Sequence, residues 1–228
     1  MIGALPDAII FDMDGLLLDT ERISRETMTA AMATFGFAMS EADFAPLIGV
    51  PDDANRLWLA ERFGPGLDYD AMRAVQVLVK AELYGDERPL KPGARDIVEQ
   101  VAALGIPRGV ATSSGGIAAE AHLGRMGLRR FMDVVVTRDD VAHGKPAPDL
   151  YLAAAAALGQ APAACLALED SYNGVRAAHA AGVPVIMVPD LLPPTDEMRA
   201  LALAIAPDLD AVRAWLRASF ALSSSNPV

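Results

Sequence analysis

The chain has 228 residues, of which 53% are hydrophobic and 21% are charged, and its formal net charge is −11. This composition excludes a disordered chain and predicts one large α/β domain, or a core domain with a smaller inserted one. The negative charge argues against a nucleic-acid partner, because a phosphate backbone attracts the opposite sign. It does not exclude a small anionic substrate, since a bound metal ion and one lysine can reverse the sign locally.

The sequence indicates a cytoplasmic protein. Its single cysteine, Cys165, excludes a disulfide within the chain and agrees with a reducing compartment. Residues 1–7 lack the basic region of a secretory signal, and no apolar run approaches the length of a membrane span. We therefore expect no membrane partner, and the sequence gives no sign of an obligate protein partner.

The first predicted element is a strand that ends in carboxylates. Residues 8–11 are apolar without polar alternation, which is typical of a strand buried on both faces of a parallel sheet. Asp12, Asp14 and Gly15 follow it. Ligands of open α/β sheets bind beyond the carboxyl ends of the strands, so these aspartates stand where chemistry is expected. The alternative is a solvated turn, since Asp-Gly is an ordinary turn signal.

The next part of the chain predicts helices only. One helix has Met28, Ala31, Met32 and Phe35 on a single face, with Gly36 suited to its end. Ser40 and Asp43 resemble a helix cap, and residues 52–63 and 70–84 predict two more helices. A helical block after the first strand indicates an inserted small domain. We place it at residues 19–87, and we expect the chain to return to the core domain at a turn-rich segment.

From Pro92 onward the pattern alternates between helices and strands. The expected strands lie at residues 106–112, 134–136, 165–169 and 183–188, with helices between them. This alternation predicts a Rossmann-like parallel sheet with helices on both faces, formed by residues 1–18 and 88–228. A last helix is expected at residues 208–218, followed by a disordered tail at residues 223–227.

Polar residues stand at the ends of several of these strands. Thr112, Ser113 and Ser114 follow one strand, and Glu169 and Asp170 follow another. In a parallel sheet they would gather at one edge with the first pair of aspartates. Hydroxyls and backbone N–H groups at a helix start can bind an anion, although a simple helix cap is the alternative. The four carboxylates would make an all-oxygen site that suits Mg²⁺.

A lysine in a stiffened loop completes the set. Lys145 lies in the segment His143-Gly144-Lys145-Pro146-Ala147-Pro148-Asp149, ahead of a predicted helix. A lone lysine in such a loop is usually a solvated surface charge. Here the two prolines stiffen the approach of the chain to Lys145.

Four segments of the chain together resemble the motifs of the haloacid dehalogenase superfamily, and the similarity extends over nearly the whole sequence. They are residues 11–21, 110–116, 143–149 and 166–174. The resemblance is to the capped sugar-phosphate phosphatases and β-phosphoglucomutases in particular. The first two motifs and residues 188–190 are also similar to the pseudouridine-5'-phosphatases. The resemblance implies that the inserted helices form a cap domain on the catalytic core.

The resemblance also implies roles for the motif residues. Asp12 would attack phosphorus and form an aspartyl-phosphate, and Asp14 would act as general acid and base. Thr112 and the backbone at Ser113 would bind the phosphoryl oxygen, and Lys145 would neutralise negative charge.

The same resemblance assigns a metal site and a substrate site. Mg²⁺ would be bound by Asp12 and Asp170, by the backbone carbonyl of Asp14, and with Glu169 in or beside the coordination shell. Candidates for substrate binding are Ser113, Glu21 and Asn173.

These assignments predict a Mg²⁺-dependent phosphatase of a small phosphorylated metabolite, a sugar or nucleoside monophosphate. The alternatives are a β-phosphoglucomutase-type phosphotransferase and a non-catalytic phosphate-binding regulator. The mutases carry an arginine after Gly-Val-x, where Asp52 follows Pro51 here, and a histidine where Ser24 stands. The intact set of four motifs argues against a regulator.

Overall fold

The computed structural model describes residues 5–48, 50, 52–85 and 89–224. The chain divides into two compact units. One, the sheet unit, comprises Met1–Leu18 and Pro89–Val228, and the other, the helical unit, comprises Asp19–Arg88. Inside the sheet unit Leu18 pairs with Leu90 in an antiparallel bridge, and Lys91 N donates to Leu17 O at 3.0 Å. The chain therefore leaves the sheet unit and returns to it at neighbouring points.

The sheet unit contains a parallel sheet with the order β3-β2-β1-β4-β5-β6. Its strands are β1 (Ala8–Phe11), β2 (Arg108–Ala111), β3 (Val134–Val136), β4 (Cys165–Glu169), β5 (Val185–Met187) and β6 (Ala204–Ile205). The register pairs Phe11 with Val110 on one side and with Leu168 on the other. The polar residues that follow these three strands therefore reach the same edge of the sheet.

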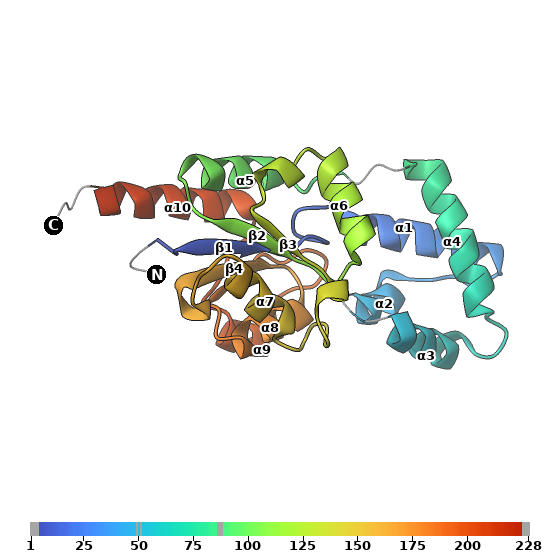
Figure 1. The fold of residues 1–228 in the computed structure, drawn as a ribbon. Helices are drawn as coiled ribbons and strands as arrows, with labels where there is room; N and C mark the ends of the chain where they lie inside the picture. Colours follow the sequence, from blue (N-terminus) through green and yellow to red (C-terminus); the bar gives the residue numbers. More distant parts are fainter. Residues whose placement is uncertain (1–4, 49, 51, 86–88, 225–228) are drawn as a thin grey trace. The chain divides into compact units, whose positions relative to one another are not determined.

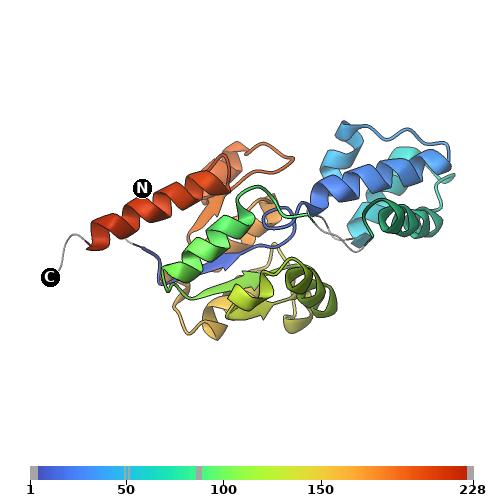
Figure 2. The ribbon, with the colours of Figure 1, turned by 90° about the horizontal axis from the view of Figure 1, so that it is seen from above.

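Helices cover both faces of this sheet, as the sequence predicts (Figures 1 and 2). On one face lie α5 (Ala94–Ala103), α6 (Gly116–Arg125) and α10 (Leu209–Ser224). On the other lie α7 (Asp149–Ala157), α8 (Tyr172–Ala180) and α9 (Asp196–Leu201). Strand β1 alternates between the two hydrophobic cores: Ile9 and Phe11 enter the first, and Ala8 and Ile10 enter the second. Short 3₁₀ helices lie at Arg129–Phe131, Arg138–Asp140 and Pro162–Ala164.

The expected disordered tail is wrong for its first two residues. Helix α10 continues to Ser224, because no proline or glycine interrupts its sequence. The buried side chains of Leu209, Val212 and Leu216 hold its first half against the sheet. Residues 225–227 of the expected tail lie outside the described residues.

The helical unit contains α1 (Thr20–Thr34), α2 (Glu41–Phe44), η1 (Ala45–Leu47), α3 (Asp52–Phe63) and α4 (Tyr69–Tyr84), and its described residues form no strand. Helix α1 packs against α4, where Gln76 Nε2 donates to Ser24 O and Thr27 Oγ1, both at 3.3 Å. Helix α2 begins with the expected cap: Asp43 N donates to Ser40 Oγ at 3.2 Å, and Ser40 N donates to Asp43 Oδ2 at 2.9 Å. This reciprocal pair satisfies two donors at the helix start.

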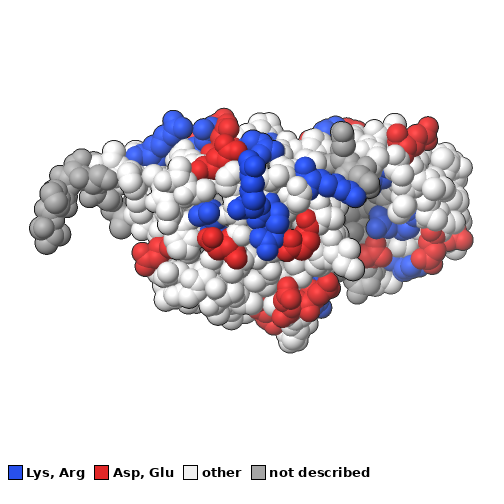
Figure 3. Space-filling model, turned by 45° about the horizontal axis from the view of Figure 1, so that its top comes forward, with Lys and Arg blue, Asp and Glu red and all other residues white. Residues whose placement is uncertain are grey.

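Basic and acidic side chains lie next to one another on the surface (Figure 3). Exposed ion pairs join Arg129 to Glu120 at 2.8 Å and Arg176 to Glu197 at 2.6 Å. Pairs of this kind contribute about 0–1 kcal/mol each to stability. In the described part of the chain, none of the helices combines the length and the apolar composition needed to cross a bilayer.

Candidate active site

Asp12 follows β1 in the middle of the sheet. Its backbone N donates to Leu168 O of β4 at 2.9 Å, which continues the strand pairing by one residue. Only 5% of Asp12 is exposed. The carboxylate therefore stands at the carboxyl edge of the sheet with little access to bulk water.

A tight loop follows Asp12 and brings the backbone against Asp170. Gly15 has a φ of +87°, and its N donates to Leu18 O at 2.8 Å. A Cβ atom on Gly15 would lie 2.2 Å from Asp170 Oδ2. Only glycine suits this position, because the backbone is in the left-handed region and a carboxylate occupies the place of a side chain.

Asp14 faces the hydroxyls that follow β2. Ser114 Oγ donates to Asp14 Oδ2 at 2.7 Å, and Thr112 Oγ1 donates to the same oxygen at 3.3 Å. Thr112 Oγ1 in turn accepts from Ser114 N at 3.0 Å. Thr112 is fully buried, and Asp14 is half-buried. These hydroxyls hold the Asp14 carboxyl in one orientation beside Asp12.

Lys145 lies between two carboxylates. Its Nζ is 2.5 Å from Asp12 Oδ1, and it also contacts Glu169 Oε1. The Lys145 side chain is only 5% exposed, so this ammonium is held inside the site and not in solvent. The loop with two prolines thus delivers the lysine that the sequence singles out.

Glu169 is fully buried and accepts from several protein donors. Its Oε1 receives Lys145 Nζ and the Tyr151 hydroxyl, the latter at 2.7 Å. Its Oε2 receives Asp170 N at 3.1 Å, Ser171 N at 3.2 Å and Ser171 Oγ at 3.1 Å. A Cβ atom on Gly174 would lie 1.8 Å from Oε1. Helix α8 therefore needs glycine there to leave room for the carboxylate.

Burial and charge determine the protonation of these groups. Burial raises the pKa of the Asp12 carboxyl to about 8, although the Lys145 ammonium acts in the opposite direction. Burial lowers the pKa of Lys145, but the carboxylates of Asp12 and Glu169 outweigh it and raise this pKa above its usual range. The lysine thus stays protonated among an excess of carboxylates. A divalent cation placed here would favour the ionised form of Asp12.

The acidic residues fit a hard divalent cation. One oxygen from each of Asp12, Glu169 and Asp170 lies within 4.8 Å of the other two. A set made only of oxygen donors suits Mg²⁺ or Ca²⁺ better than Zn²⁺ or copper. Asp12 and Asp170 are the better candidates, since both oxygens of Glu169 already accept from protein donors.

The three candidate substrate-binding residues make none of the contacts described above. Ser113 lies beside Thr112, but its side chain is exposed. Asn173 lies in the first turn of α8, where its Oδ1 accepts from Arg176 Nη1 at 3.2 Å. Glu21 lies in the first turn of α1, in the helical unit. The structure thus brings together the strand-end residues and Lys145, whereas a substrate role for Glu21 and Asn173 stays a prediction.

Sequence reasoning missed two contacts in the site. In the sequence Ser114 is only part of a hydroxyl run, and its hydrogen bond to Asp14 depends on how the loop after β2 turns. Tyr151 carries no motif signal, although it is fully buried and its hydroxyl reaches Glu169. A tyrosine in the Ala-rich helix α7 was the available signal, because a buried phenol needs a polar partner.

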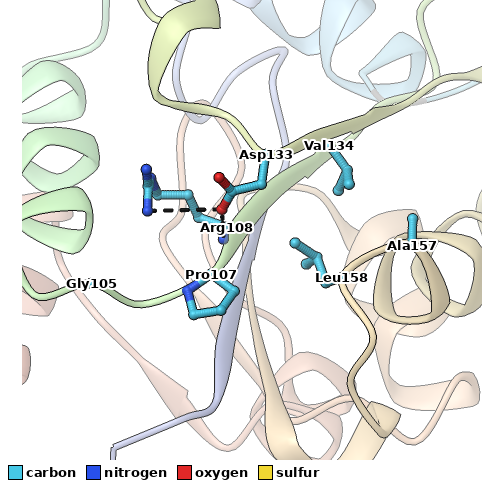
Figure 4. Close-up of a pocket in the computed structure, with 7 residues that line it drawn as sticks. All are labelled: Gly105, Pro107, Arg108, Asp133, Val134, Ala157 and Leu158. Carbon is cyan, nitrogen blue, oxygen red and sulfur yellow. Dashed lines mark hydrogen bonds and ion pairs between the residues drawn. The ribbon is translucent and has the colours of Figure 1, made fainter.

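A pocket of about 430 Å³ lies at the amino-terminal ends of β2 and β3, away from the candidate site (Figure 4). Its lining includes Arg108 and Val134, the first residues of β2 and β3, and Leu158 just after α7. Asp133 closes one side, where its Oδ2 accepts from Arg108 N at 2.9 Å. Ligands of parallel sheets bind at the carboxyl edge, so this pocket is not the candidate site.

Known proteins share this sequence and this fold. The family model described as haloacid dehalogenase-like hydrolase matches residues 6–182. Hexitol phosphatase B of Escherichia coli (strain K12) is 35% identical over 186 residues, which cover 80% of this chain and 83% of that protein. The "Probable pseudouridine-5'-phosphatase" of Drosophila melanogaster is 33% identical over 187 residues, with coverage of 79% and 80%.

A solved structure extends the similarity to three dimensions. A "putative beta-phosphoglucomutase" from Thermotoga maritima superposes with a TM-score of 0.75 at 28% identity. The match covers 91% of this chain and 97% of the other. The family resemblance read from the motifs and the expected Rossmann-like fold are therefore both confirmed.

Proposed function

This chain belongs to the haloacid dehalogenase-like hydrolases, and we propose that it is a Mg²⁺-dependent phosphatase of small phosphorylated metabolites. Its family and its relatives named as phosphatases make it a phosphoric monoester hydrolase. The finer proposal names a sugar or nucleoside monophosphate as substrate, in keeping with the hexitol and pseudouridine-5'-phosphate specificities in the names of those relatives.

One observation carries the proposal: a buried carboxylate at the end of β1 lies beside a buried ammonium and a second acidic pair. Asp12 Oδ1 is 2.5 Å from Lys145 Nζ, and Asp12, Glu169 and Asp170 share one cluster. A carboxylate repels a phosphate dianion, so positive charge is needed before the two can meet. Lys145 supplies part of it, and bound Mg²⁺ would supply the remainder by neutralising phosphoryl oxygens.

The proposed first step is attack by Asp12 on phosphorus. A bond forms between an Asp12 carboxylate oxygen and phosphorus, while the bond from phosphorus to the leaving oxygen breaks. Asp14 gives a proton to that leaving oxygen, so the product is a neutral alcohol. The hydroxyls of Ser114 and Thr112 support this role because they fix the Asp14 carboxyl close to Asp12.

The proposed second step returns the enzyme to its starting state. The oxygen of a water molecule bonds to the phosphorus of the aspartyl-phosphate, the bond from phosphorus to the Asp12 oxygen breaks, and Asp14 accepts the proton that this water loses. Inorganic phosphate leaves, and both aspartates recover their first form. Asp12 and Asp170, with the backbone carbonyl of Asp14, are the proposed ligands of Mg²⁺, and Glu169 would stand beside them.

We assign the choice of leaving group to the helical unit, as a cap domain. In such a unit a mutase needs groups that grip a second phosphate, and a bidentate arginine is the natural one. Here Asp52 accepts from the Tyr69 hydroxyl at 2.7 Å and lies 3.4 Å from Arg73 Nε. These contacts lie within the helical unit, and our proposal of transfer to water rests on the acidic Asp52 standing where the mutases carry an arginine.

The likeness to a β-phosphoglucomutase structure makes transfer to a sugar the second candidate. A screen of sugar and nucleoside monophosphates, with Mg²⁺ present and absent, tests the phosphatase proposal. We expect free phosphate equal to the substrate consumed. β-Glucose 1-phosphate with a bisphosphate primer tests the second candidate. Glucose 6-phosphate that accumulates without matching phosphate release would reject hydrolysis in favour of the mutase reaction.

A further inference from the structure

Tyr151 lies near the start of α7 and is fully buried. A phenol in the protein interior requires a hydrogen-bond partner, and its partner here is a carboxylate of the candidate site. The Tyr151 hydroxyl donates to Glu169 Oε1 at 2.7 Å. Burial and the nearby carboxylates hold the pKa of Tyr151 well above its usual value, so the hydroxyl keeps its proton and acts as a donor.

The ring of the same tyrosine contacts the lysine of the site. Lys145 Nζ lies over the ring, 5.2 Å from its centroid, within the range of a cation–π interaction. Lys145 and Glu169 are themselves paired. One buried side chain thus meets both members of this ion pair, the carboxylate through its hydroxyl and the ammonium through its ring face.

The carboxylates of Asp12 and Glu169 compete for the Lys145 ammonium. Asp12 and Glu169 are both within contact of the single ammonium. The hydroxyl of Tyr151 donates to the same oxygen of Glu169 that Lys145 contacts. It thereby offsets part of the negative charge on that oxygen and weakens its attraction for Lys145.

We propose that Tyr151 is a positioning residue that keeps the Lys145 ammonium on Asp12, through its hydroxyl on Glu169 and its ring face against the ammonium. This proposal rests on the proposed function, in which Asp12 is the nucleophile. Without the hydroxyl, Glu169 draws Lys145 away from Asp12. Without the ring as well, the ammonium also loses the surface against which it lies.

Tyr151→Phe tests the hydroxyl alone, because phenylalanine keeps the ring and nearly the same volume. With p-nitrophenyl phosphate and saturating Mg²⁺ we expect kcat to fall about tenfold and KM to change by less than about twofold, as for a lost hydrogen bond to a charged group. Tyr151→Leu also removes the ring, and its kcat should fall further, by about a hundredfold in total.

Leu150→Val is the matched control. Leu150 is the neighbouring residue of α7, is fully buried and belongs to the same hydrophobic core. This variant should lower the melting temperature at least as much as Tyr151→Phe does, with kcat unchanged. Calorimetric titration with Mg²⁺ alone gives a readout without turnover. Its dissociation constant should fall in Tyr151→Phe, because the lost hydroxyl and the ammonium drawn away from Asp12 both leave more negative charge on the carboxylates that would bind the ion.

Three results would overturn this proposal. They are a Tyr151→Phe protein with wild-type kcat, a rise in KM with kcat unchanged, and an equal loss of kcat in Leu150→Val. Phosphate release by the wild-type protein distinguishes failure of the positioning role from failure of the proposed function. A wild type that releases no phosphate from any ester rejects both, whereas an active wild type with an unaffected Tyr151→Phe variant rejects the positioning role alone.

Discussion

Asp12 and Lys145 face each other at 2.5 Å, and each is almost excluded from water. At such a distance the identity of each charged atom matters more than the shape of the side chain. Asparagine has nearly the shape of aspartate but carries no charge and is a poor nucleophile. Asp12→Asn and Asp14→Asn therefore each keep the shape of the site and remove one chemical function.

Asp12→Asn should lower kcat by at least about 10³-fold, because the attacking oxygen is lost while the neighbouring donors stay in place. Phosphate release with a saturating ester measures the loss. Circular dichroism and the melting temperature should match the wild type. Near-normal turnover in this variant would reject the aspartyl-phosphate mechanism.

Asp14→Asn should lower kcat by about 10²–10⁴-fold for an alkyl phosphate, since the leaving alcohol loses its proton donor. Formation of the aspartyl-phosphate from p-nitrophenyl phosphate should suffer less, because p-nitrophenolate leaves without a proton. Rapid mixing should then show a burst of p-nitrophenolate, followed by slow hydrolysis. Equal losses for both esters in the first step would contradict the role of Asp14 as general acid.

Among the helices, α8 has a position where the Glu169 carboxylate leaves no room for a side chain. Gly174 is buried in this helix, and a Cβ atom there would meet three atoms of the Glu169 carboxyl group at 2.1 Å or less. Glu169 has little freedom to move aside, because its two oxygens are held by Lys145, Tyr151 and Ser171. Overpacking is therefore the expected result of any side chain at this point.

Gly174→Ala should lower the free energy of unfolding by about 1–3 kcal/mol and lower kcat as Glu169 shifts. Gly124→Ala in α6 is the control, since a Cβ atom there would meet nothing within 4 Å. In that open helical position alanine should raise the free energy of unfolding by about 0.5–1 kcal/mol. Urea unfolding of both variants measures the difference, and similar shifts in both would show that Glu169 yields easily.

The elements that carry the site could be predicted from the sequence, and the smaller ones could not. Strands β1 and β4 are continuous apolar runs that stop at Asp12 and Glu169, which is a strong local signal. Strand β6 has only 2 residues and α9 only 6, too few to show a period. The contact between Tyr151 and Glu169 joins residues 18 apart, and it depends on how α7 packs against the sheet.

The buried carboxylates of Asp12, Glu169 and Asp170 lie close enough together to favour a bound cation. A ligand that binds the folded state alone raises the free energy of unfolding by mass action. Metal binding should therefore be visible in the stability of the protein as well as in its turnover.

Removal of metal with EDTA should abolish turnover, and Mg²⁺ should restore it. Mg²⁺ at about 100 times its dissociation constant should add about 2.7 kcal/mol to the free energy of unfolding, seen as a higher melting temperature. Ca²⁺ should raise the melting temperature too, yet inhibit, because its larger and looser coordination misplaces the attacking oxygen. Turnover that persists after exhaustive chelation would contradict the metal site.

The bridge between Leu18 and Leu90 has a consequence for how this architecture can vary. It places the exit and the re-entry of the chain side by side within the sheet unit, so joining them directly closes only a short loop. Loop-closure entropy grows slowly with length, and inserts of very different size cost nearly the same at such a point. Asp12, Lys145 and Asp170 all lie on the sheet side of this junction. If the helical insert acts as the proposed cap, exchanging it would change the substrate while Asp12, Lys145 and Asp170 stay where they are.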